Sequence, residues 1–173
     1  MNETIESLVT RRSVKAYKSD AVSRDLIEEI VKAGTYAPTG MNRQSPLIVV
    51  VSNKELRDKL SAMNAAILGT NSDPFYGAPV VMVVLADKSF PTYRYDGSLV
   101  MANLMNAAHS LGLGSCWIHR AKEEFESEEG KKLLKEWGIE GDYEGIAHCI
   151  IGYPAKELPA PKPRKEGYVR YID

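Results

Sequence analysis

Apolar residues recur along the chain with two periodicities, and these predict helices and strands. Apolar residues spaced three and four apart predict amphipathic helices over Thr4–Thr10, Ser23–Thr35 and a segment that begins after Asn53. Ser23 and Asn53 can each cap a helix, because their side chains accept hydrogen bonds from its first free N–H groups. Short β-branched runs predict strands at Leu47–Val51, Val80–Ala86, Ser115–His119 and Ile146–Tyr153. The first of these is continuously apolar, which predicts burial on both faces.

Two further segments differ in their polarity. Ser98–Leu111 carries few polar side chains, which predicts a helix buried in the core or at a subunit interface, and Gly112-Leu113-Gly114 ends it. The charged stretch Glu123–Trp137 predicts a single surface helix whose charges are solvated. Its inward-facing residues are expected to be Phe125, Leu133, Leu134 and Trp137.

The proline-rich last segment, Pro154–Asp173, cannot form a core by itself. It ends in an alternating run, Tyr168–Ile172, so we expect an extended arm that adds to the edge of a sheet. No internal repeat or linker is visible. The chain therefore predicts a single α+β domain, in which helices surround a small sheet.

Composition narrows the class of protein. A length of 173 residues, with 44% apolar and 26% charged residues, suits one globular domain or one protomer of an assembly. The 22 Lys and Arg against 23 Asp and Glu give a net charge of −1, which argues against nucleic-acid binding. No apolar run reaches the ~18 residues that span a bilayer, and the N-terminus is acidic where a signal peptide is basic. We expect no membrane association and a cytoplasmic location.

Common catalytic and metal-binding motifs are absent. The chain has no P-loop, no His-Glu-x-x-His and no Gly-x-Ser-x-Gly, and Gly112–Trp117 lacks the third glycine of the dinucleotide fingerprint. Cys116 and Cys149 are too few for a disulfide framework and too far apart for a local metal site. Cys116 is expected to be buried and unreactive. We therefore predict no metal site and no catalytic dyad.

Two basic clusters could bind an anion. Arg11, Ser13 and Lys15 would point to one side of an extended backbone, where cations and a hydroxyl suit a phosphate or another oxyanion. Near the other end, Lys162-Pro163-Arg164-Lys165 adds further cations on a proline-stiffened segment. The alternative for both clusters is a solvated charged surface.

Two other segments could contact a planar ligand. Asn42 and Gln44 lie in the irregular stretch Ala37–Pro46, and they offer donors and acceptors to a heteroaromatic ring. The alternative is an ordinary loop. In Gly114–His119 the leading glycine would let such a ring approach the backbone closely.

Taken in order, these segments resemble the nitroreductase family of flavin mononucleotide (FMN)-dependent oxidoreductases. Arg11-Arg12-Ser13-Val14-Lys15-Ala16-Tyr17 is similar to the family's opening signature, and Ala37–Pro46 to its Ala-Pro-Ser/Thr-x-x-Asn-x-Gln-x-Pro loop. Leu111–Ile118 resembles the strand that follows the central helix in this family. Ile151-Gly152-Tyr153-Pro154, followed by Pro161-Lys162-Pro163-Arg164, resembles the closing motif.

The resemblance implies a fold and an assembly. We expect a small mixed, mainly antiparallel sheet flanked by helices, with residues 1–173 forming one FMN-binding domain. Residues 1–153 would form the core, and residues 154–173 an arm that extends onto the partner of a homodimer. Each of the two identical sites would contain residues of both chains.

The resemblance also implies the roles of individual residues. Those expected to hold the FMN phosphate, ribityl chain and pyrimidine edge are Arg11, Arg12, Ser13 and Lys15, with Lys162 and Arg164 completing the phosphate site. Those expected to reach the flavin from the partner are Thr39, Asn42 and Gln44. Trp117, Ile118 and His119 would pass along the ring, with a backbone N–H near N5, and Asn71 would touch the flavin.

The expected reaction is hydride transfer from NADH or NADPH, through flavin N5, to a small acceptor such as a nitroaromatic or quinone by a ping-pong mechanism. The flavin carries the chemistry, so no catalytic side chain is expected beyond electrostatic tuning by Lys15 or Arg11. One alternative is a flavoprotein that oxidises or dehalogenates a specific metabolite, or that degrades flavin. Another is a non-catalytic module that binds a nucleotide or a protein.

Overall fold

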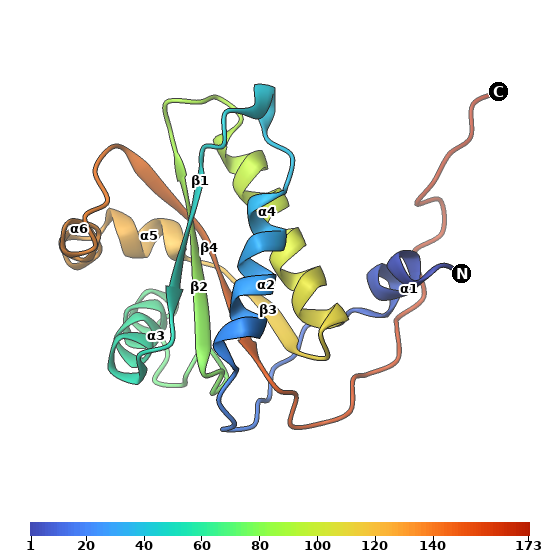
Figure 1. The fold of residues 1–173 in the computed structure, drawn as a ribbon, viewed down its shortest axis with the longest axis horizontal. Coiled ribbons are helices and arrows are strands. Elements are labelled where there is room, and N and C mark those ends of the chain that lie inside the picture. Colours follow the sequence, from blue (N-terminus) through green and yellow to red (C-terminus); the bar gives the residue numbers. More distant parts are fainter.

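A four-stranded sheet lies between two layers of helices in the computed structural model, which describes residues 1–173 (Figure 1). In spatial order the strands are β1 (Pro46–Val51), β2 (Val80–Asp87), β4 (Tyr143–Gly152) and β3 (Gly114–Ile118). All three neighbouring pairs are antiparallel. A parallel bridge from Ser13 to Ser115 adds the N-terminal segment beside β3, so the sheet is mixed but mainly antiparallel, as predicted.

The helices divide between the two faces of the sheet (Figure 1). One face is covered by α2 (Arg24–Thr35) and α4 (Tyr93–Ser110), and the other by α3 (Lys54–Leu68), α5 (Ala121–Glu126) and α6 (Glu128–Glu136). A short 3₁₀ turn, η1 (Gly40–Asn42), precedes β1, and α1 (Glu3–Thr10) begins the chain. No helix is long and apolar enough to cross a membrane.

The predicted helix starts are confirmed by their caps. Ser23 Oγ accepts a hydrogen bond from the N–H of Leu26 at 3.4 Å, and Asn53 Oδ1 accepts one from the N–H of Leu56 at 2.9 Å. Each cap satisfies one of the free donors of the first turn. The nearly apolar helix is also present, but α4 begins at Tyr93, five residues before the predicted Ser98.

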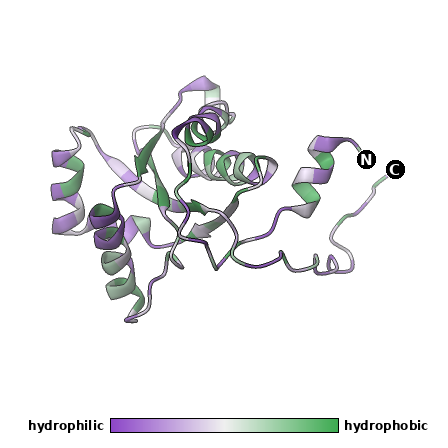
Figure 2. Ribbon diagram, turned by 60° about the horizontal axis from the view of Figure 1, so that its bottom comes forward, coloured by the Kyte–Doolittle hydropathy of each residue, from purple (hydrophilic) through white to green (hydrophobic).

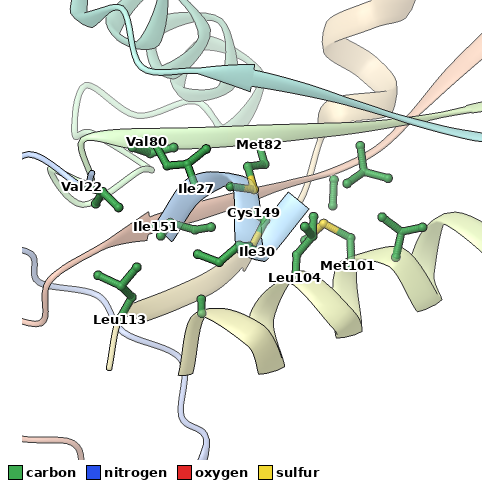
Figure 3. Close-up of a cluster of buried hydrophobic side chains, with 14 of the residues drawn as sticks. Val22, Ile27, Ile30, Val80, Met82, Met101, Leu104, Leu113, Cys149 and Ile151 are labelled. Atoms are coloured by element: carbon green, nitrogen blue, oxygen red, sulfur yellow. The ribbon is translucent and has the colours of Figure 1, made fainter. Parts of the chain in front are cut away.

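The core between the sheet and α2 and α4 holds mainly branched and sulfur-containing side chains (Figure 3). Ile30 of α2 and Leu104 of α4 are fully buried and meet Met82 of β2. Each such burial stabilises the fold by about 1.5–3 kcal/mol. Cys149 also lies here, and its burial raises the pKa of the thiol far above the usual value.

A second core lies on the opposite face, under α3, α5 and α6. Phe75, Leu60 and Leu133 are buried there against β2 and β4. Because successive side chains of a strand point to opposite faces, β2 supplies Val80, Met82 and Val84 to the first core and Val81, Val83 and Leu85 to the second. The continuous apolar run in β2 thus reflects a strand covered on both sides.

The prediction that Leu47–Val51 is a fully buried strand is only partly confirmed, because both faces pack against the two cores but are incompletely covered. β1 is at the edge of the sheet and pairs with β2 alone, and only Val51 is buried while the residues before it are half-buried. An edge strand has a neighbour on one side only, so less of its surface is covered.

The prediction of one surface helix over Glu123–Trp137 is also wrong. Ser127 has extended backbone dihedrals and separates α5 from α6, and its hydroxyl accepts a hydrogen bond from the N–H of Gly130 at 3.0 Å. A Cβ on Gly130 would lie 2.0 Å from the carbonyl oxygen of Glu124, so the sharp turn requires glycine. Glu124 itself is fully buried rather than solvated.

The two ends of the chain lie apart from the core. Figures 1 and 2 show α1 and the segment after residue 154 on the same side, away from the sheet. The tail begins beside residues 16–18, where the N–H of Ala155 donates to the carbonyl of Ala16 at 3.0 Å. Beyond this point the tail is exposed and contains neither helix nor strand, so the run Tyr168–Ile172 pairs with no strand of its own chain.

Candidate functional site

The segment after α1 runs along the exposed edge of β3. The N–H of Val14 donates to the carbonyl of Ser115 at 3.0 Å, and the side chain of Val14 is buried. Ser13 and Lys15 therefore alternate to the exposed side, as predicted. A Cβ on Gly114 would lie 2.7 Å from Val14 Cγ2, so this close approach requires a glycine.

The two predicted basic clusters lie around one hollow. A cavity of about 780 Å³ is lined by Arg11, Arg12 and Ser13 on one side and by the segment Pro161–Arg164 on the other. Arg12 Nη1 donates to the carbonyls of Val9 and Arg11, but Arg12 Nε and Arg11 Nη1 are buried and have no partner. A buried N–H without a partner is costly, so these donors suit an anion in the hollow.

Lys15 lies beyond this hollow, on a smaller cavity of about 270 Å³ that Ser13 also lines. Its ammonium group lies over the ring of Tyr76, with 5.7 Å between the nitrogen and the ring centroid. Behind the strand, burial raises the pKa of Cys116, although a hydrogen bond from Ser13 and the charges of Lys15 and Arg11 oppose this. Cys116 is thus a buried, protonated thiol, as the sequence predicted.

The loop around η1 has an unusual backbone. Met41, Asn42 and Gln44 have φ values of 53°, 54° and 52°, in the left-handed region that non-glycine residues rarely adopt. The hydroxyl of Thr39 accepts a hydrogen bond from the N–H of Gln44 at 3.1 Å, and Gln44 Nε2 donates to Asn42 Oδ1 at 3.3 Å. The three residues predicted to reach a flavin therefore form one cluster.

Asp96 holds this loop, and sequence reasoning did not identify it. Its buried carboxylate accepts hydrogen bonds from the N–H of Gly40 at 2.9 Å, the hydroxyl of Ser45 at 3.0 Å and the hydroxyl of Thr92 at 2.9 Å. No signal in the sequence indicates this role, because the predicted helix begins at Ser98 and only the structure extends α4 far enough back to include Asp96. A carboxylate is buried only when it is well paired.

The loop and the Arg11 hollow lie at opposite ends of α4. Gly40 contacts Asp96 near the start of this helix, while Thr10 contacts His109 near its end, with 2.9 Å between the hydroxyl and Nε2. Thirteen residues of helix (109 − 96) correspond to about 20 Å. Within one chain, Thr39, Asn42 and Gln44 are therefore not brought to the Arg11 cluster.

At the end of β3 the predicted residues face different ways. Ile118 is buried in the second core, so only its backbone is left to face a ligand. Trp117 is half-buried and His119 exposed, and both line a hollow of about 230 Å³ that Arg94 and Arg120 also border.

A buried polar network that includes His148 fixes the end of β3. His148 Nε2 and Glu124 Oε1 are 2.9 Å apart, and both side chains are fully buried. Glu124 also accepts a hydrogen bond from Asn64 Nδ2, which donates to the carbonyl of His119 at 2.7 Å. Arg120, with φ of 78°, donates through Nε to Asn64 Oδ1.

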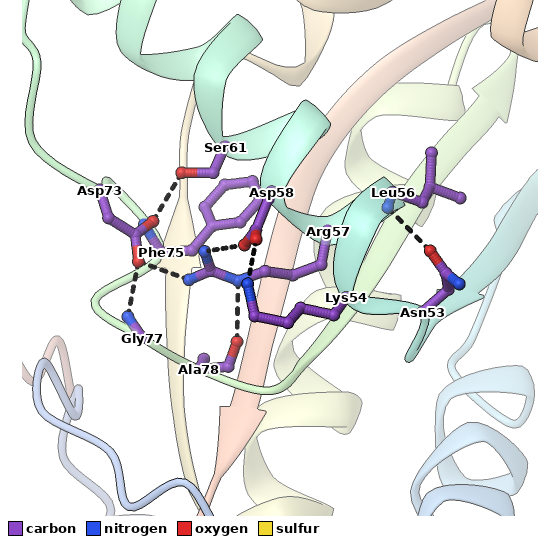
Figure 4. A network of polar contacts seen from close by, with 10 residues as sticks. All are labelled: Asn53, Lys54, Leu56, Arg57, Asp58, Ser61, Asp73, Phe75, Gly77 and Ala78. Atoms are coloured by element: carbon purple, nitrogen blue, oxygen red, sulfur yellow. Dashed lines mark hydrogen bonds and ion pairs between the residues drawn. The ribbon is translucent and has the colours of Figure 1, made fainter.

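A second network shapes the loop between α3 and β2 (Figure 4). The predicted Asn71 lies in this loop and is exposed. The carboxylate of Asp73 accepts hydrogen bonds from Arg57 Nη2, from Ser61 Oγ at 2.6 Å and from two backbone N–H groups. Partial burial raises the pKa of Asp73, but these hydrogen bonds outweigh it and leave the pKa below its usual value. Arg57 Nε also donates to the carbonyl of Ala78 at 3.0 Å.

Comparison with known proteins identifies relatives whose descriptions agree with one another. The family model described as Nitroreductase family matches residues 8–153. The chain is 31% identical to a protein of Archaeoglobus fulgidus with the provisional name NADH dehydrogenase/NAD(P)H nitroreductase, over 97% of this chain and 91% of that protein. It is 25% identical to the FMN reductase [NAD(P)H] of Bacillus subtilis, over 95% of this chain and 70% of that protein.

Solved structures agree with these sequence relatives. A Bacteroides fragilis nitroreductase with bound FMN has a TM-score of 0.91 to this chain at 25% identity, with both chains covered completely. A nitroreductase with bound FMN from Desulfitobacterium hafniense has a TM-score of 0.89 at 26% identity, again with complete coverage of both. The expected fold is therefore confirmed.

Proposed function

The chain belongs to the nitroreductase family, and from this premise we propose that it passes hydride from NADH or NADPH, through bound FMN, to a small-molecule acceptor. It is an NAD(P)H-dependent FMN oxidoreductase. The relatives named FMN reductase [NAD(P)H] and the related structures with bound FMN support both the cofactor and the hydride donor.

One observation carries the proposal: the hollow that Arg11, Arg12 and Ser13 share with Lys162 and Arg164. Four cationic side chains and a hydroxyl line it, and two of these cations, Arg11 and Arg12, each have a buried nitrogen with no protein partner. A phosphate monoester such as that of FMN fits this donor set, because its oxygens accept several charge-assisted hydrogen bonds at once.

The remaining site residues would bind and orient the flavin ring. Lys15, beyond the phosphate hollow, would face the pyrimidine edge and stabilise the negative charge that develops there on reduction. Trp117 and His119 would lie along the ring, and Asn71 would touch it. When bound, FMN supplies the chemistry by accepting and donating hydride at N5. No acid–base side chain is needed.

We expect the two substrates to use one open face of the flavin in turn. NAD(P)H would deliver hydride and leave before a nitroaromatic, a quinone or a similar acceptor binds. The exposed position of His119 and the hollow beside Trp117 support an accessible site.

The complete site would belong to a homodimer. Thr39, Asn42 and Gln44 lie at the other end of α4 from Arg11, so a second copy of the chain would supply them. Residues 1–153 would form the core of this single FMN-binding domain, and the exposed residues 154–173 an arm that crosses to the partner.

The test is spectroscopic and kinetic. The purified protein, after incubation with FMN and removal of free flavin, should retain flavin absorbance. It should consume NADH or NADPH when a nitroaromatic or quinone is present, with parallel double-reciprocal lines for a ping-pong mechanism. A halogenated aromatic substrate serves as the comparison for the dehalogenase alternative. Protein that takes up no FMN would contradict the proposal.

The phosphate site can be tested separately. Arg11→Ala and Lys162→Ala should each weaken FMN binding about 10- to 150-fold, because each removes a charge-assisted hydrogen bond of roughly 1.5–3 kcal/mol. The dissociation constant from flavin fluorescence measures the effect. Lys18→Ala and Lys32→Ala, which remove exposed cations outside the hollow, are the matched controls. If both site variants bind FMN like the controls, the phosphate lies elsewhere.

A further inference from the structure

The loop from Gly69 to Pro79 joins α3 to β2 and contains a strained residue. Tyr76 has a φ of 53°, and Gly77, which follows it, a φ of 76°. For a bulky non-glycine residue this left-handed conformation costs roughly 1 kcal/mol or more. Strain of this size persists only where the surroundings hold the backbone in place.

Asp73 holds the backbone on both sides of Tyr76 (Figure 4). Its carboxylate accepts hydrogen bonds from the N–H of Phe75 at 2.9 Å and of Gly77 at 2.7 Å, and its carbonyl accepts one from the N–H of Tyr76 at 3.1 Å. Arg57 pairs with the same carboxylate and lies over the ring of Phe75, 5.5 Å from its centroid. Phe75 is fully buried, which anchors the loop to the second core.

The result of this conformation is the position of one aromatic ring. Phe75 points into the core, while the next side chain, Tyr76, is 40% exposed and lies under the ammonium group of Lys15 at 5.7 Å. This distance is within the ~6 Å over which the negative face of an aromatic ring attracts a cation. Lys15 follows the buried Val14 on a backbone fixed to β3, so its flexible end is the part that the ring can restrain.

We propose that Tyr76 is a positioning residue for Lys15, which it holds toward the pyrimidine edge of the flavin so that the reduced cofactor is bound more tightly than the oxidised one. The inference rests on the proposed function, since it takes Lys15 as a flavin contact. Two observations carry it together: a strained backbone held by Asp73 and Arg57, and the cation–ring contact that this backbone produces.

A double-mutant cycle on the FMN-loaded protein tests the proposal. Tyr76→Asn removes the ring but keeps a residue that tolerates the left-handed region, and Tyr76→Phe keeps the ring. Tyr76→Asn should lower the FMN midpoint potential. The shift should correspond to a roughly two- to fivefold decrease in the ratio of the dissociation constant of oxidised FMN to that of reduced FMN. Tyr76→Phe should retain the wild-type potential.

The same substitution in a Lys15→Met background separates positioning from a structural role. If Tyr76 acts through Lys15, then Tyr76→Asn should cause no further shift of potential once the ammonium group is absent. Tyr95→Asn, at an exposed tyrosine of α4, is the matched control. An unchanged potential in Tyr76→Asn, or an equal shift with and without Lys15, would overturn the inference while FMN still binds. A wild-type protein without FMN affinity would instead overturn the proposed function and this inference with it.

Discussion

Residues with strained backbones lie in three separate loops that each carry or adjoin candidate site residues. The non-glycine residues with positive φ are Met41, Asn42, Gln44, Tyr76 and Arg120. Three of them form the η1 loop, one lies under Lys15, and one follows His119 at the end of β3. Strain persists where hydrogen bonds compensate it, and here the compensating groups are Asp96, Asp73 and Asn64.

The candidate site was predictable from sequence only in part. Arg11, Arg12 and Ser13 were identifiable because consecutive cations with a hydroxyl are visible in any window of the chain, and the structure places them beside Lys162 and Arg164. The buried acids that hold the loops of the site could not be identified in this way. Asp96 and Glu124 look like ordinary acids in sequence, and only their burial among donors shows that they hold the loops of the site.

Asp73 gives the fold a pH dependence whose sign follows from its pKa. The pKa of this carboxyl is lower in the folded protein than in the unfolded chain, where it is about 4. Its stabilising contribution is therefore complete above pH ~4 and is lost as the pH falls through the lower, folded pKa. Asp73→Asn should cost about 1–3 kcal/mol at neutral pH, because Arg57 loses one of its two carboxylate partners.

Urea denaturation of the wild type and Asp73→Asn across pH 3–8 measures this contribution. The difference between their free energies of unfolding should be constant above about pH 5 and should narrow toward low pH. Asp20→Asn, at an exposed acid, is the control and should show little difference at any pH. If the difference in the free energy of unfolding between wild type and Asp73→Asn stays constant down to pH 3, Asp73 is not the titrating group.

At the scale of elements, the break between α5 and α6 shows which signals can be read in sequence. The apolar spacing continues through Glu123–Trp137 and suggests one helix, but Ser127 followed by Glu128 and Glu129 is a helix start with an acidic first turn. The prediction of a single helix did not use this local signal, which marks the start of α6. The burial of β1 was not predictable in this way, because the position of a strand in a sheet depends on its neighbours rather than on its own residues.

The tail is the other element whose role can be tested directly. No residue after Tyr153 belongs to either core, whereas Lys162 and Arg164 line the hollow with Arg11. A chain that ends at Ala155 should therefore keep its secondary structure, as measured by circular dichroism. Its dissociation constant for FMN should rise at least tenfold. The proposed homodimer of this shortened chain should also dissociate into monomers at higher protein concentration than the wild type, as measured by size-exclusion chromatography with light scattering. Retention of full FMN affinity would show that the arm takes no part in the site.

At the scale of the whole molecule, apolar side chains are exposed where the chain stands away from its core. Ile5, Leu8 and Val9 of α1 are about half exposed, at 47%, 49% and 51%, and Tyr171 and Ile172 of the tail are 86% and 90% exposed. Figures 1 and 2 show α1 and the tail on the same side of the molecule, apart from the sheet. Exposed apolar side chains on segments that stand away from the core are typical of association between chains, which supports the proposed homodimer.

The sequence by itself determined most of the elements, since caps and apolar periodicity are local properties of neighbouring residues, and its ordered motifs determined the family and with it the cofactor. Tertiary structure alone decided which acids are buried, which strand is at the edge, and which ring lies under Lys15. These features join residues far apart in the chain: 24 positions separate Glu124 from His148, 55 separate Asn64 from His119, and 56 separate Gly40 from Asp96. No local pattern records such contacts, because they form only when packing of the two cores brings the segments together.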